Sequence, residues 1–267
     1  MSRRSSAPVK KPLKPIKILL AKTLSEDDNI DGWWASEKLD GIRAIWTGEK
    51  FISRYGNTLF APEWFTESLP AMRLDGELWV GRGEFQRTSS YVRKHEPIDA
   101  EWEQVTYMAF DLPDVDLPFE ARQELLHDAV DGLPWAKVVK QTRIKNRVQL
   151  RSKLKELFAR GSEGLMLREP GSYYETKRSS TLFKVKQVLD AEAVIVGYKS
   201  GKGKYKGLLG AYEMQMPDGN EFELSGMDDV MRHDPLPIGT VVTYEYQELT
   251  DSGKPRHPRY LRVYEPV

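Results

Sequence analysis

The sequence predicts an α+β protein in which a mixed first domain is followed by a small β-barrel. Between residues 33 and 110, short stretches of aromatic and β-branched residues alternate with DG, TGEK and YGN turns, which predicts strands. Two amphipathic segments, 119–131 and 147–160, predict helices. Beyond Leu189, five short strand-like segments are separated by Gly, Pro and Lys turns, a pattern typical of the OB fold.

The elements follow from the same signals in chain order. The first domain has strand-like segments at 32–39, 42–48, 50–56, 74–81, 105–112, 164–169 and 180–189. Short helices are expected within 63–72 and 85–94, and Gly161 ends the helix at 147–160. The barrel strands are expected at 191–200, 208–217, 220–226, 239–249 and 259–266, with almost no helical pattern. We therefore expect a basic, disordered tail at 1–16, a first domain at 17–189 and the barrel at 190–267.

The composition excludes several classes of function. The 267 residues are enough for one large or two smaller domains with buried cores, and a hydrophobic share of 40% indicates a globular chain. Because the formal net charge is zero, affinity for phosphates must come from local clusters of basic residues. The absence of Cys excludes disulfides, thiol catalysis and thiolate zinc sites. The four His are scattered, so an oxygen-ligated Mg²⁺ is the metal that stays open.

The sequence shows no membrane or secretion signal of sufficient length. No window approaches an apolar membrane span, and the apolar run Ile18–Ala21 is too short for the core of a signal peptide. We expect no association with membranes. We expect a cytoplasmic protein, or a periplasmic one if a signal peptide has been removed.

The stretch ASEKLDGIRAIW, residues 35–46, holds the first candidate for chemistry. Asp40-Gly41 between alternating apolar flanks predicts a two-residue hairpin in which Lys38 faces Arg43. Like charges opposed on a strand pair are unfavourable unless they are solvated or share an anion. A lysine is a nucleophile only without its proton, and a neighbouring cation or metal lowers the pKa of an amine. Lys38 is therefore a candidate covalent nucleophile.

Four further charged residues stand in unusual places on predicted strands. Lys184 and Lys186 are two residues apart, so both lie on one face of a strand that otherwise looks buried. Such a pair indicates a phosphate or carboxylate partner. Glu77 and Glu163 begin apolar strands, where carboxylates could hold a hydrated Mg²⁺ or a ribose hydroxyl. Taken alone, each is more simply an exposed glutamate at the end of a strand.

The order of the motifs is more specific than any one of them. EKLDGIR, SRYGN, LDGEL, AFD, EGLMLR and LFKVK follow one another, and a β-barrel comes next. This set resembles the ordered motifs of the covalent nucleotidyltransferases, which comprise DNA ligases, RNA ligases and mRNA capping enzymes. Over roughly residues 17–267 the chain looks like an ATP-dependent DNA ligase of the minimal bacterial E type. The resemblance implies a nucleotidyltransferase (ATP-grasp-like) adenylation domain followed by an OB-fold domain.

The resemblance also implies a role for each motif residue. Lys38 would attack the α-phosphate of ATP and carry AMP as a phosphoramidate, and Glu163 would hold Mg²⁺, with Glu77 as a second metal ligand. The other predicted ATP-site residues are Glu37 at the adenine, Arg43 and Arg54 at the AMP phosphate and ribose or the 5′-phosphate of a nick, Glu77 at the ribose hydroxyl, Phe110 stacked on the adenine, Lys184 and Lys186 at the phosphates, and Arg178. Of these, Arg43, Lys184 and Lys186 are also predicted to be catalytic.

Two basic clusters in the barrel are predicted to contact DNA. YKSGKGKYKGLLGAY carries Lys199, Lys202, Lys204 and Lys206, which suit the phosphate backbone of a duplex, although a solvated hairpin explains them too. GKPRHPRYLRVYEP resembles the C-terminal motif that reaches the outer phosphates of ATP, and Arg256, Arg259 and Arg262 fit its arginines. Many ligases continue with another arginine and an Asp-Lys pair. Tyr264 and Glu265-Pro266 stand here instead, so the last basic role in this motif stays open.

The predicted function is the sealing of 5′-phosphate/3′-hydroxyl nicks in duplex DNA by a monomer that uses ATP and Mg²⁺. The reaction would pass through a lysyl-AMP and a DNA-adenylate. An RNA ligase or capping-type enzyme would share the Lys38 chemistry and is one alternative. A non-catalytic OB-type nucleic-acid-binding protein is an alternative of another class. The sequence leaves open whether DNA repair, replication, recombination or DNA uptake is served.

Overall fold

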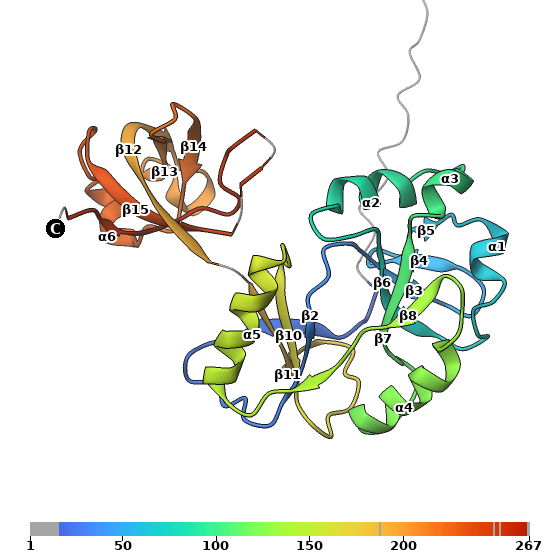
Figure 1. The fold of residues 1–267 in the computed structure, drawn as a ribbon. Coiled ribbons are helices and arrows are strands. Elements are labelled where there is room, and N and C mark those ends of the chain that lie inside the picture. The colour runs from blue at the N-terminus through green and yellow to red at the C-terminus, as the bar shows by residue number, and fades with distance from the viewer. Residues whose placement is uncertain (1–15, 187, 248, 251, 266–267) are drawn as a thin grey trace, which may run out of the picture. The chain divides into compact units, whose positions relative to one another are not determined.

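The computed structural model describes residues 16–186, 188–247, 249–250 and 252–265. Its contacts divide the chain into two compact units between Val185 and Lys186 (Figure 1). The boundary predicted after Leu189 falls one residue into strand β12 (Leu189–Ser200). The tail predicted at 1–16 lies outside the described residues except for Ile16.

The first unit is built on two β-sheets. One has the strand order β1 (Leu20–Thr23), β11 (Arg178–Lys186), β10 (Gly164–Arg168), β2 (Trp34–Glu37) and β9 (Thr142–Arg143). The other has the order β5 (Thr58–Leu59), β4 (Phe51–Ser53), β3 (Ile42–Trp46), β6 (Leu74–Trp79), β7 (Thr106–Asp111) and β8 (Ala136–Val138). The mixed α+β architecture predicted for this part of the chain is confirmed.

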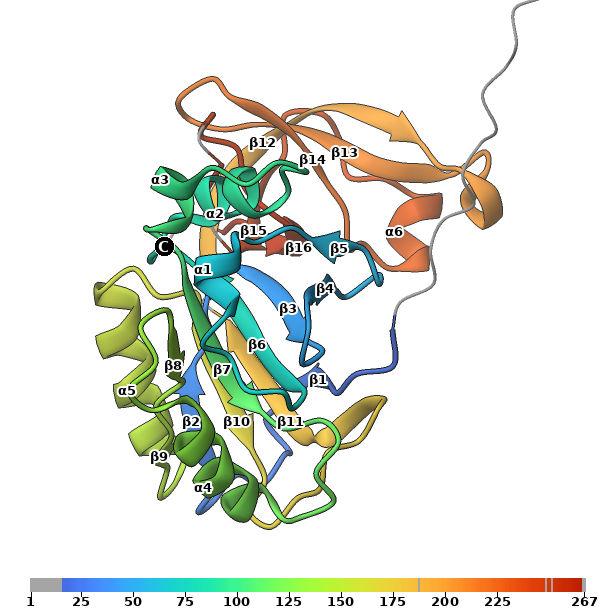
Figure 2. The same ribbon diagram turned by 90° about the vertical axis from the view of Figure 1, so that its right-hand side faces the viewer.

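Helices pack against both sheets (Figure 2). They are α1 (Glu63–Thr66), α2 (Phe85–Val92), α3 (Asp99–Trp102), α4 (Phe119–Val130) and α5 (Arg147–Ala159). Helix α4 packs on β7 and β8, α2 on β3 and β6, and α5 on β10. Asn146 caps α5 by accepting the N–H of Gln149 at 3.0 Å, and Gly161 follows its end with a φ of +75°. The predicted helix is confirmed, although Val148 of its apolar stripe is 75% exposed.

Strand β10 shows how one sheet serves both the core and a site. Leu165 and Leu167 are fully buried and belong to a core cluster with Leu150 of α5. Successive side chains of a strand point to opposite faces. Met166 and Arg168 therefore lie on the other face, where both line a cavity.

The hairpin predicted at Asp40-Gly41 is wrong. Strand β2 pairs with β10 and β9, whereas β3 pairs with β4 and β6, so the connection between β2 and β3 crosses from one sheet to the other. Gly41 is needed for close approach, because a Cβ there would lie 2.4 Å from the carbonyl oxygen of Leu78 on β6. Lys38 therefore stands where the two sheets meet, and its backbone N–H donates to the carbonyl of Gly164 at 2.9 Å.

The second unit is a five-stranded sheet that closes on itself. Its order is β14 (Glu221–Leu224), β13 (Leu209–Gln215), β12, β15 (Val241–Tyr246) and β16 (Arg259–Val263). Ser225, after β14, forms a bridge with Arg259 of β16, and the Tyr260 N–H donates to the Ser225 carbonyl at 2.8 Å. Because β14 and β16 are the two edges of the sheet, this bridge closes the barrel. Tyr212, Met214, Leu224 and Tyr244 fill its core.

Several short elements were not predicted. They include α6 (Asp229–His233), which begins after its cap Asp228, and the 3₁₀ turn Gly203–Tyr205. A helix of five residues is too short to show an amphipathic period, which explains why the sequence pattern missed α6. In the described part of the chain, no helix combines the length and the apolar character that crossing a bilayer requires.

Candidate active site

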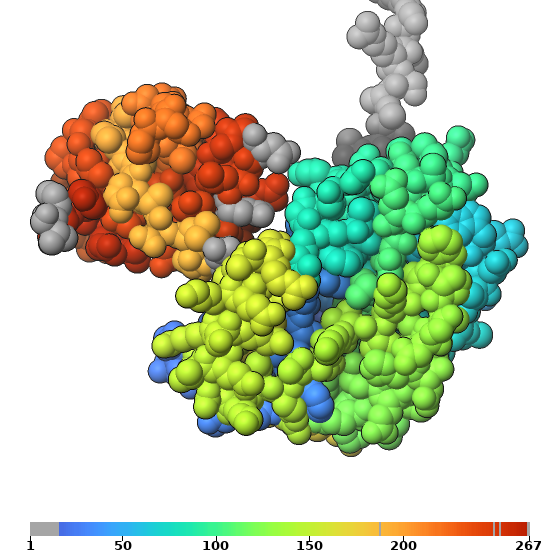
Figure 3. Space-filling model, in the orientation of Figure 1, coloured from blue at the N-terminus to red at the C-terminus, as the bar shows by residue number. Residues whose placement is uncertain are grey.

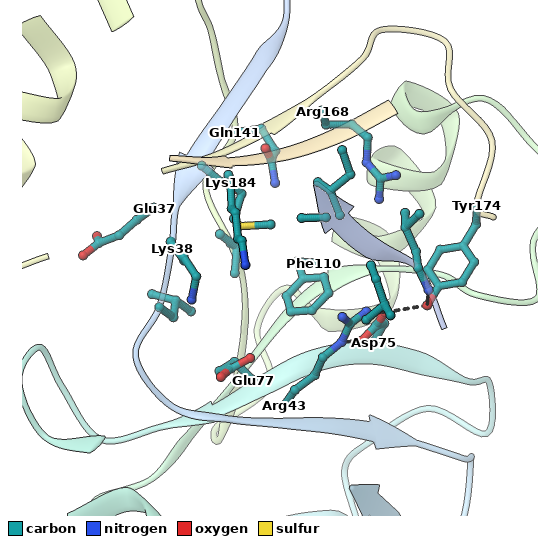
Figure 4. A pocket seen from close by; sticks show the side chains of 18 of the residues that line it. Glu37, Lys38, Arg43, Asp75, Glu77, Phe110, Gln141, Arg168, Tyr174 and Lys184 are labelled. Carbon is teal, nitrogen blue, oxygen red and sulfur yellow. Dashed lines mark hydrogen bonds and ion pairs between the residues drawn. The ribbon is translucent and has the colours of Figure 1, made fainter. Parts of the chain in front are cut away.

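A cavity of about 310 Å³ in the first unit is lined by residues from both sheets. Strands β1, β2, β10 and β11 contribute from one sheet, and β3, β6 and β7 from the other. In the space-filling view, blue atoms of the N-terminal strands are visible between the yellow-green segment that includes α5 and the green segments (Figure 3). The close-up shows Lys38, Lys184, Glu77, Arg43 and Phe110 around this cavity (Figure 4). Five residues predicted from four separate motifs are thus brought together.

The candidate nucleophile is paired with a carboxylate. Lys38 Nζ lies 2.5 Å from Glu163 Oε2, and the two side chains are 23% and 18% exposed. They come from the connection after β2 and from the residue just before β10, which are adjacent because the two strands pair. The Lys38 amine is therefore accessible from the cavity. Its orientation is fixed by the hydrogen bond that it donates to Glu163.

Glu77, on β6, is a partly buried carboxyl group with charged neighbours, among them Lys38 and Arg43. Burial raises its pKa to about 8, although Lys38 and Arg43 act in the opposite direction. A protonated carboxyl group can donate a hydrogen bond as well as accept one. At neutral pH, Glu77 is therefore equipped to bind a hydroxyl or another neutral polar group.

Arg43 is fixed by a buried aspartate that the sequence did not single out. Its Nε and Nη2 donate to the two carboxylate oxygens of Asp75 at 3.0 and 2.6 Å. Asp75 is fully buried and also accepts the hydroxyl of Tyr174 at 2.6 Å. The guanidinium lies 5.4 Å from the centre of the Phe110 ring. Two-point pairing and ring contact hold the cation at the cavity wall in a single orientation.

The remaining predicted ATP-site residues differ in their placement. Arg54 and Arg178 line the cavity, and Arg178 donates to the backbone carbonyl of Ala21. The Nε of Arg54 is buried and has no hydrogen-bond partner within the described residues, so it has a donor to offer a ligand. Lys184 also lines the cavity. Lys186 does not belong to the lining, and its Nζ donates to Gln247 in the second unit at 3.1 Å.

Glu37 is engaged with a residue outside the motifs. Its two carboxylate oxygens accept Nε and Nη2 of Arg82 at 2.6 and 2.7 Å. Burial alone would raise the pKa of Glu37, but the bonds from Arg82 and Ser162 outweigh burial and lower it. In Figure 4 its side chain points away from Lys38. The predicted contact of Glu37 with adenine would need this pair to open, or would use the backbone.

The comparisons with known proteins agree with the motifs. A family model described as ATP dependent DNA ligase domain matches residues 18–186, and one described as DNA ligase OB-like domain matches residues 200–263. The DNA ligase of Haemophilus influenzae is 33% identical over 236 residues, which are 87% of each chain.

The chain belongs to the ATP-dependent DNA ligases.

Solved structures place this ligase near the minimal members of the family. A Lig E DNA ligase, solved in work on DNA binding with a minimal scaffold, is 38% identical, with a TM-score of 0.83. That match covers 92% of this ligase and 98% of the other chain. A Chlorella virus DNA ligase-adenylate is 27% identical with a TM-score of 0.55, over 94% of this chain and 100% of that one. The predicted family, fold and enzyme class are confirmed.

The acidic residues of the ligase fit a loosely held Mg²⁺. Among the described residues, no group of three or more His, Cys, Asp or Glu side chains could hold a metal ion. Mg²⁺ at nucleotide sites commonly keeps several waters and takes only one or two carboxylates together with substrate phosphates. Glu163 and Glu77 offer such a pair, because both lie beside the Lys38 side chain, and Glu77 would release its proton when the metal bound.

The basic residues predicted in the barrel of the ligase are mostly exposed. Lys199 is paired with Glu223, and Lys204 lies over the ring of Tyr205 at 4.5 Å. The other predicted DNA contacts of this unit are Lys202, Lys206, Arg256, Arg259 and Arg262, of which only Arg256 is half-buried. Their contact with DNA stays a prediction.

An irregular pairing in β16 concerns two of these arginines. Arg259 pairs with Glu245 and Arg262 with Thr243, with a register shift between them. Glu245 and Thr243 are two apart on β15, so the shift places both arginines on one face despite their spacing of three. The arginine spacing of the C-terminal motif is therefore compatible with one shared ligand.

Sequence reasoning missed several cavity residues, among them Asp75, Gln141, Arg168 and Tyr174. Asp75 had a usable signal, because it stands two residues before Glu77 on the same strand and so shares its face. Arg168 is 6% exposed, and its Nη1 has no hydrogen-bond partner in the described part of the chain. Its motif EGLMLR indicated a role for Glu163 alone. Tyr174 comes from a loop, where no periodicity could have marked it.

Proposed function

We propose that this ligase seals nicks between a 5′-phosphate and a 3′-hydroxyl in duplex DNA, with Lys38 as the residue that carries AMP. The observation that supports this best is the Lys38–Glu163 pair, accessible from a cavity that Arg43, Arg54 and Lys184 also line. A lysine that is held by a carboxylate and surrounded by cations suits attack on a phosphate.

The first step joins AMP to the enzyme. Lys38 Nζ forms a bond to the α-phosphorus of ATP, and the bond from that phosphorus to the pyrophosphate oxygen breaks. Glu163 already accepts the hydrogen bond of this amine, so it is placed to take the proton that the amine must lose. Arg43, Arg54 and Lys184 balance the charge that develops on the phosphoryl oxygens.

The next two steps transfer AMP to DNA and then release it. An oxygen of the 5′-phosphate at the nick bonds to the phosphorus of lysyl-AMP, the P–N bond breaks, and Lys38 regains a proton. The 3′-hydroxyl then bonds to the 5′-phosphorus, loses its proton, and AMP leaves. When bound, Mg²⁺ would neutralise phosphate charge, and Glu163 and Glu77 would hold it.

The other residues bind and orient the substrates. Phe110 stacks on the adenine and Glu77 binds a ribose hydroxyl, whose recognition suits a carboxyl group that is protonated at neutral pH. The exposed barrel lysines and arginines bind the phosphate backbone. Role in repair, replication or recombination, monomeric state and cytoplasmic location stay predictions, with a periplasmic location as the alternative.

A nick-sealing assay with matched lysine variants tests this proposal. The wild type, Lys38→Ala and Lys155→Ala are compared, with Lys155 chosen because it is an exposed lysine on α5. With ATP and Mg²⁺, we expect the wild type and Lys155→Ala to seal nicked DNA equally. Lys38→Ala should lose on the order of 10³-fold or more in rate, as expected when a nucleophile is removed.

Substrate and cofactor series separate this function from its alternatives. Faster sealing of nicked RNA than nicked DNA would favour an RNA ligase. DNA binding without ATP-dependent sealing would favour a non-catalytic binding protein. Chelation of Mg²⁺ should abolish sealing in the wild type, and equal sealing with and without chelator would contradict the metal requirement.

A further inference from the structure

A partly buried chain of hydrogen bonds runs from a loop to Arg43. The backbone N–H of Leu19 donates to the Tyr174 hydroxyl at 3.2 Å, and that hydroxyl donates to Asp75 Oδ2 at 2.6 Å. The same Asp75 oxygen accepts Arg43 Nη2 at 2.6 Å. Figure 4 shows Tyr174 reaching Asp75 from one side of the cavity while Arg43 reaches it from the other.

This chain of hydrogen bonds connects the two sheets of the first unit. Tyr174 belongs to the loop between β10 and β11 of one sheet, whereas Asp75 and Arg43 lie on β6 and β3 of the other. The loop itself is held, because Arg122 donates to the carbonyl of Ser172 at 2.9 Å and Gly171 donates its N–H to Glu120 at 2.9 Å. Because its loop is held in place, Tyr174 can fix the position of Asp75.

The Tyr174 hydroxyl has the chemistry of a permanent donor. Burial and the neighbouring Asp75 both raise its pKa above the ordinary value, so the phenol keeps its proton. A carboxylate otherwise rotates easily about its terminal torsion. The tyrosine and the two N–H groups of Arg43 together fix that torsion, and with it the direction of the guanidinium.

We propose that Tyr174 is a positioning residue for the ligase reaction, which acts through Asp75 to hold Arg43 toward the transferring phosphate. This inference rests on the proposed function, because it takes Arg43 as a phosphate-binding group. Tyr174 itself does not touch the reacting atoms. Its removal should therefore weaken only what Arg43 contributes.

The test is a double-mutant cycle with a neighbouring tyrosine as control. Tyr174→Phe removes only the hydroxyl, and Tyr173→Phe removes the hydroxyl of an adjacent side chain that is 51% exposed. Each is made in the wild type and in Arg43→Ala. Rates are measured for transfer of AMP from ATP to the enzyme and for sealing of a nick that already carries AMP, and thermal midpoints are recorded.

We expect Tyr174→Phe to slow the steps that Arg43→Ala slows, by roughly tenfold, as for loss of a hydrogen bond to a charged group. In the Arg43→Ala background, Tyr174→Phe should add less than about twofold, because coupled residues are not additive. Tyr173→Phe should match the wild type in both backgrounds.

Two results would overturn the inference. One is a Tyr174→Phe enzyme as fast as Tyr173→Phe. The other is an equal loss in both backgrounds, which would make the effect of the hydroxyl purely structural. Failure of the wild type to seal nicks would instead reject the proposed function, so the two failures are distinguishable.

Discussion

At the scale of single residues, the cavity combines two cations that are held by carboxylates with a carboxyl group whose pKa is raised. Lys38 is held by Glu163 and Arg43 by Asp75, while burial raises the pKa of Glu77. A carboxyl group of this kind is unfavourable for stability when ionised, since burial penalises its charge. Such groups are common at sites that gain their partner only when a substrate binds.

The raised pKa of Glu77 makes stability depend on pH. The folded state holds the proton up to about pH 8, whereas the unfolded state releases it near the ordinary glutamate pKa of 4.5. Folding stability should therefore fall as pH rises between these two values and change no further above the higher one. Glu77→Gln has no carboxyl group to titrate. Its thermal midpoint should therefore rise relative to that of the wild type as pH increases from 4.5 to 8.

The measurement is thermal unfolding of both proteins without nucleotide across this range. Other titrating groups cancel in the difference between the two midpoints. A difference that stays constant with pH would show that Glu77 has an ordinary pKa.

Sequence reasoning predicted the motif residues of the site but not their partners. The motif residues stand in short sequence patterns that are recognisable without a structure; they are Lys38, Glu77, Glu163 and Lys184. Arg82 and Tyr174 come from loops far along the chain, and which loop residue reaches a motif carboxylate depends on non-local packing. Lys186 shares the pattern with Lys184, yet it begins the second unit and bonds there to Gln247.

At the scale of elements, one buried aspartate joins a strand end to a helix and a second strand. Asp111 ends β7 and accepts Nε and Nη2 of Arg122, on α4, at 2.6 and 3.1 Å. It also accepts Nη2 of Arg168 at the end of β10. Asp111 and Arg122 are fully buried, so two guanidinium groups depend on one carboxylate. This cluster connects the two sheets beside the cavity.

Removal of that negative charge should destabilise the first unit strongly. Asp111→Asn keeps the size of the side chain but leaves two buried cations without a counter-charge, which we expect to cost about 3–5 kcal/mol. Asp114→Asn is the control, because Asp114 is 65% exposed and 3.4 Å from its partner Arg73. The control should change stability by less than about 0.5 kcal/mol. Denaturant unfolding measures both, and equal small effects would refute a structural role for the cluster.

Elements with a regular pattern of apolar residues were predictable from the sequence, and the connections between them were not. The apolar spacing of α5 and the alternation of the barrel strands are local properties of the sequence. The wrong hairpin arose because Asp40-Gly41 carries a strong local turn signal. The close approach of Gly41 to Leu78 on β6 is a tertiary requirement for the same residue type, and sequence alone does not distinguish the two.

At the scale of the whole molecule, the ligase consists of two units that fold around separate cores. The first contains the cavity and the candidate nucleophile, and the second supplies exposed basic residues. The order of six motifs followed by a barrel was sufficient to predict both units, since this order resembles that of a family with a known fold. The exact boundary was not, because β12 begins almost directly after β11.

The central claim is that the Lys38 amine carries AMP, and one measurement tests it most directly. The wild type is incubated with ATP labelled at the α-phosphate and Mg²⁺, digested without acid, and the modified peptide is located by mass spectrometry. We predict a single acid-labile AMP on Lys38 that disappears when nicked DNA is added, and none in Lys38→Arg. Sealing activity with AMP on another residue, Lys184 included, or with no AMP on the protein at all, would contradict the account.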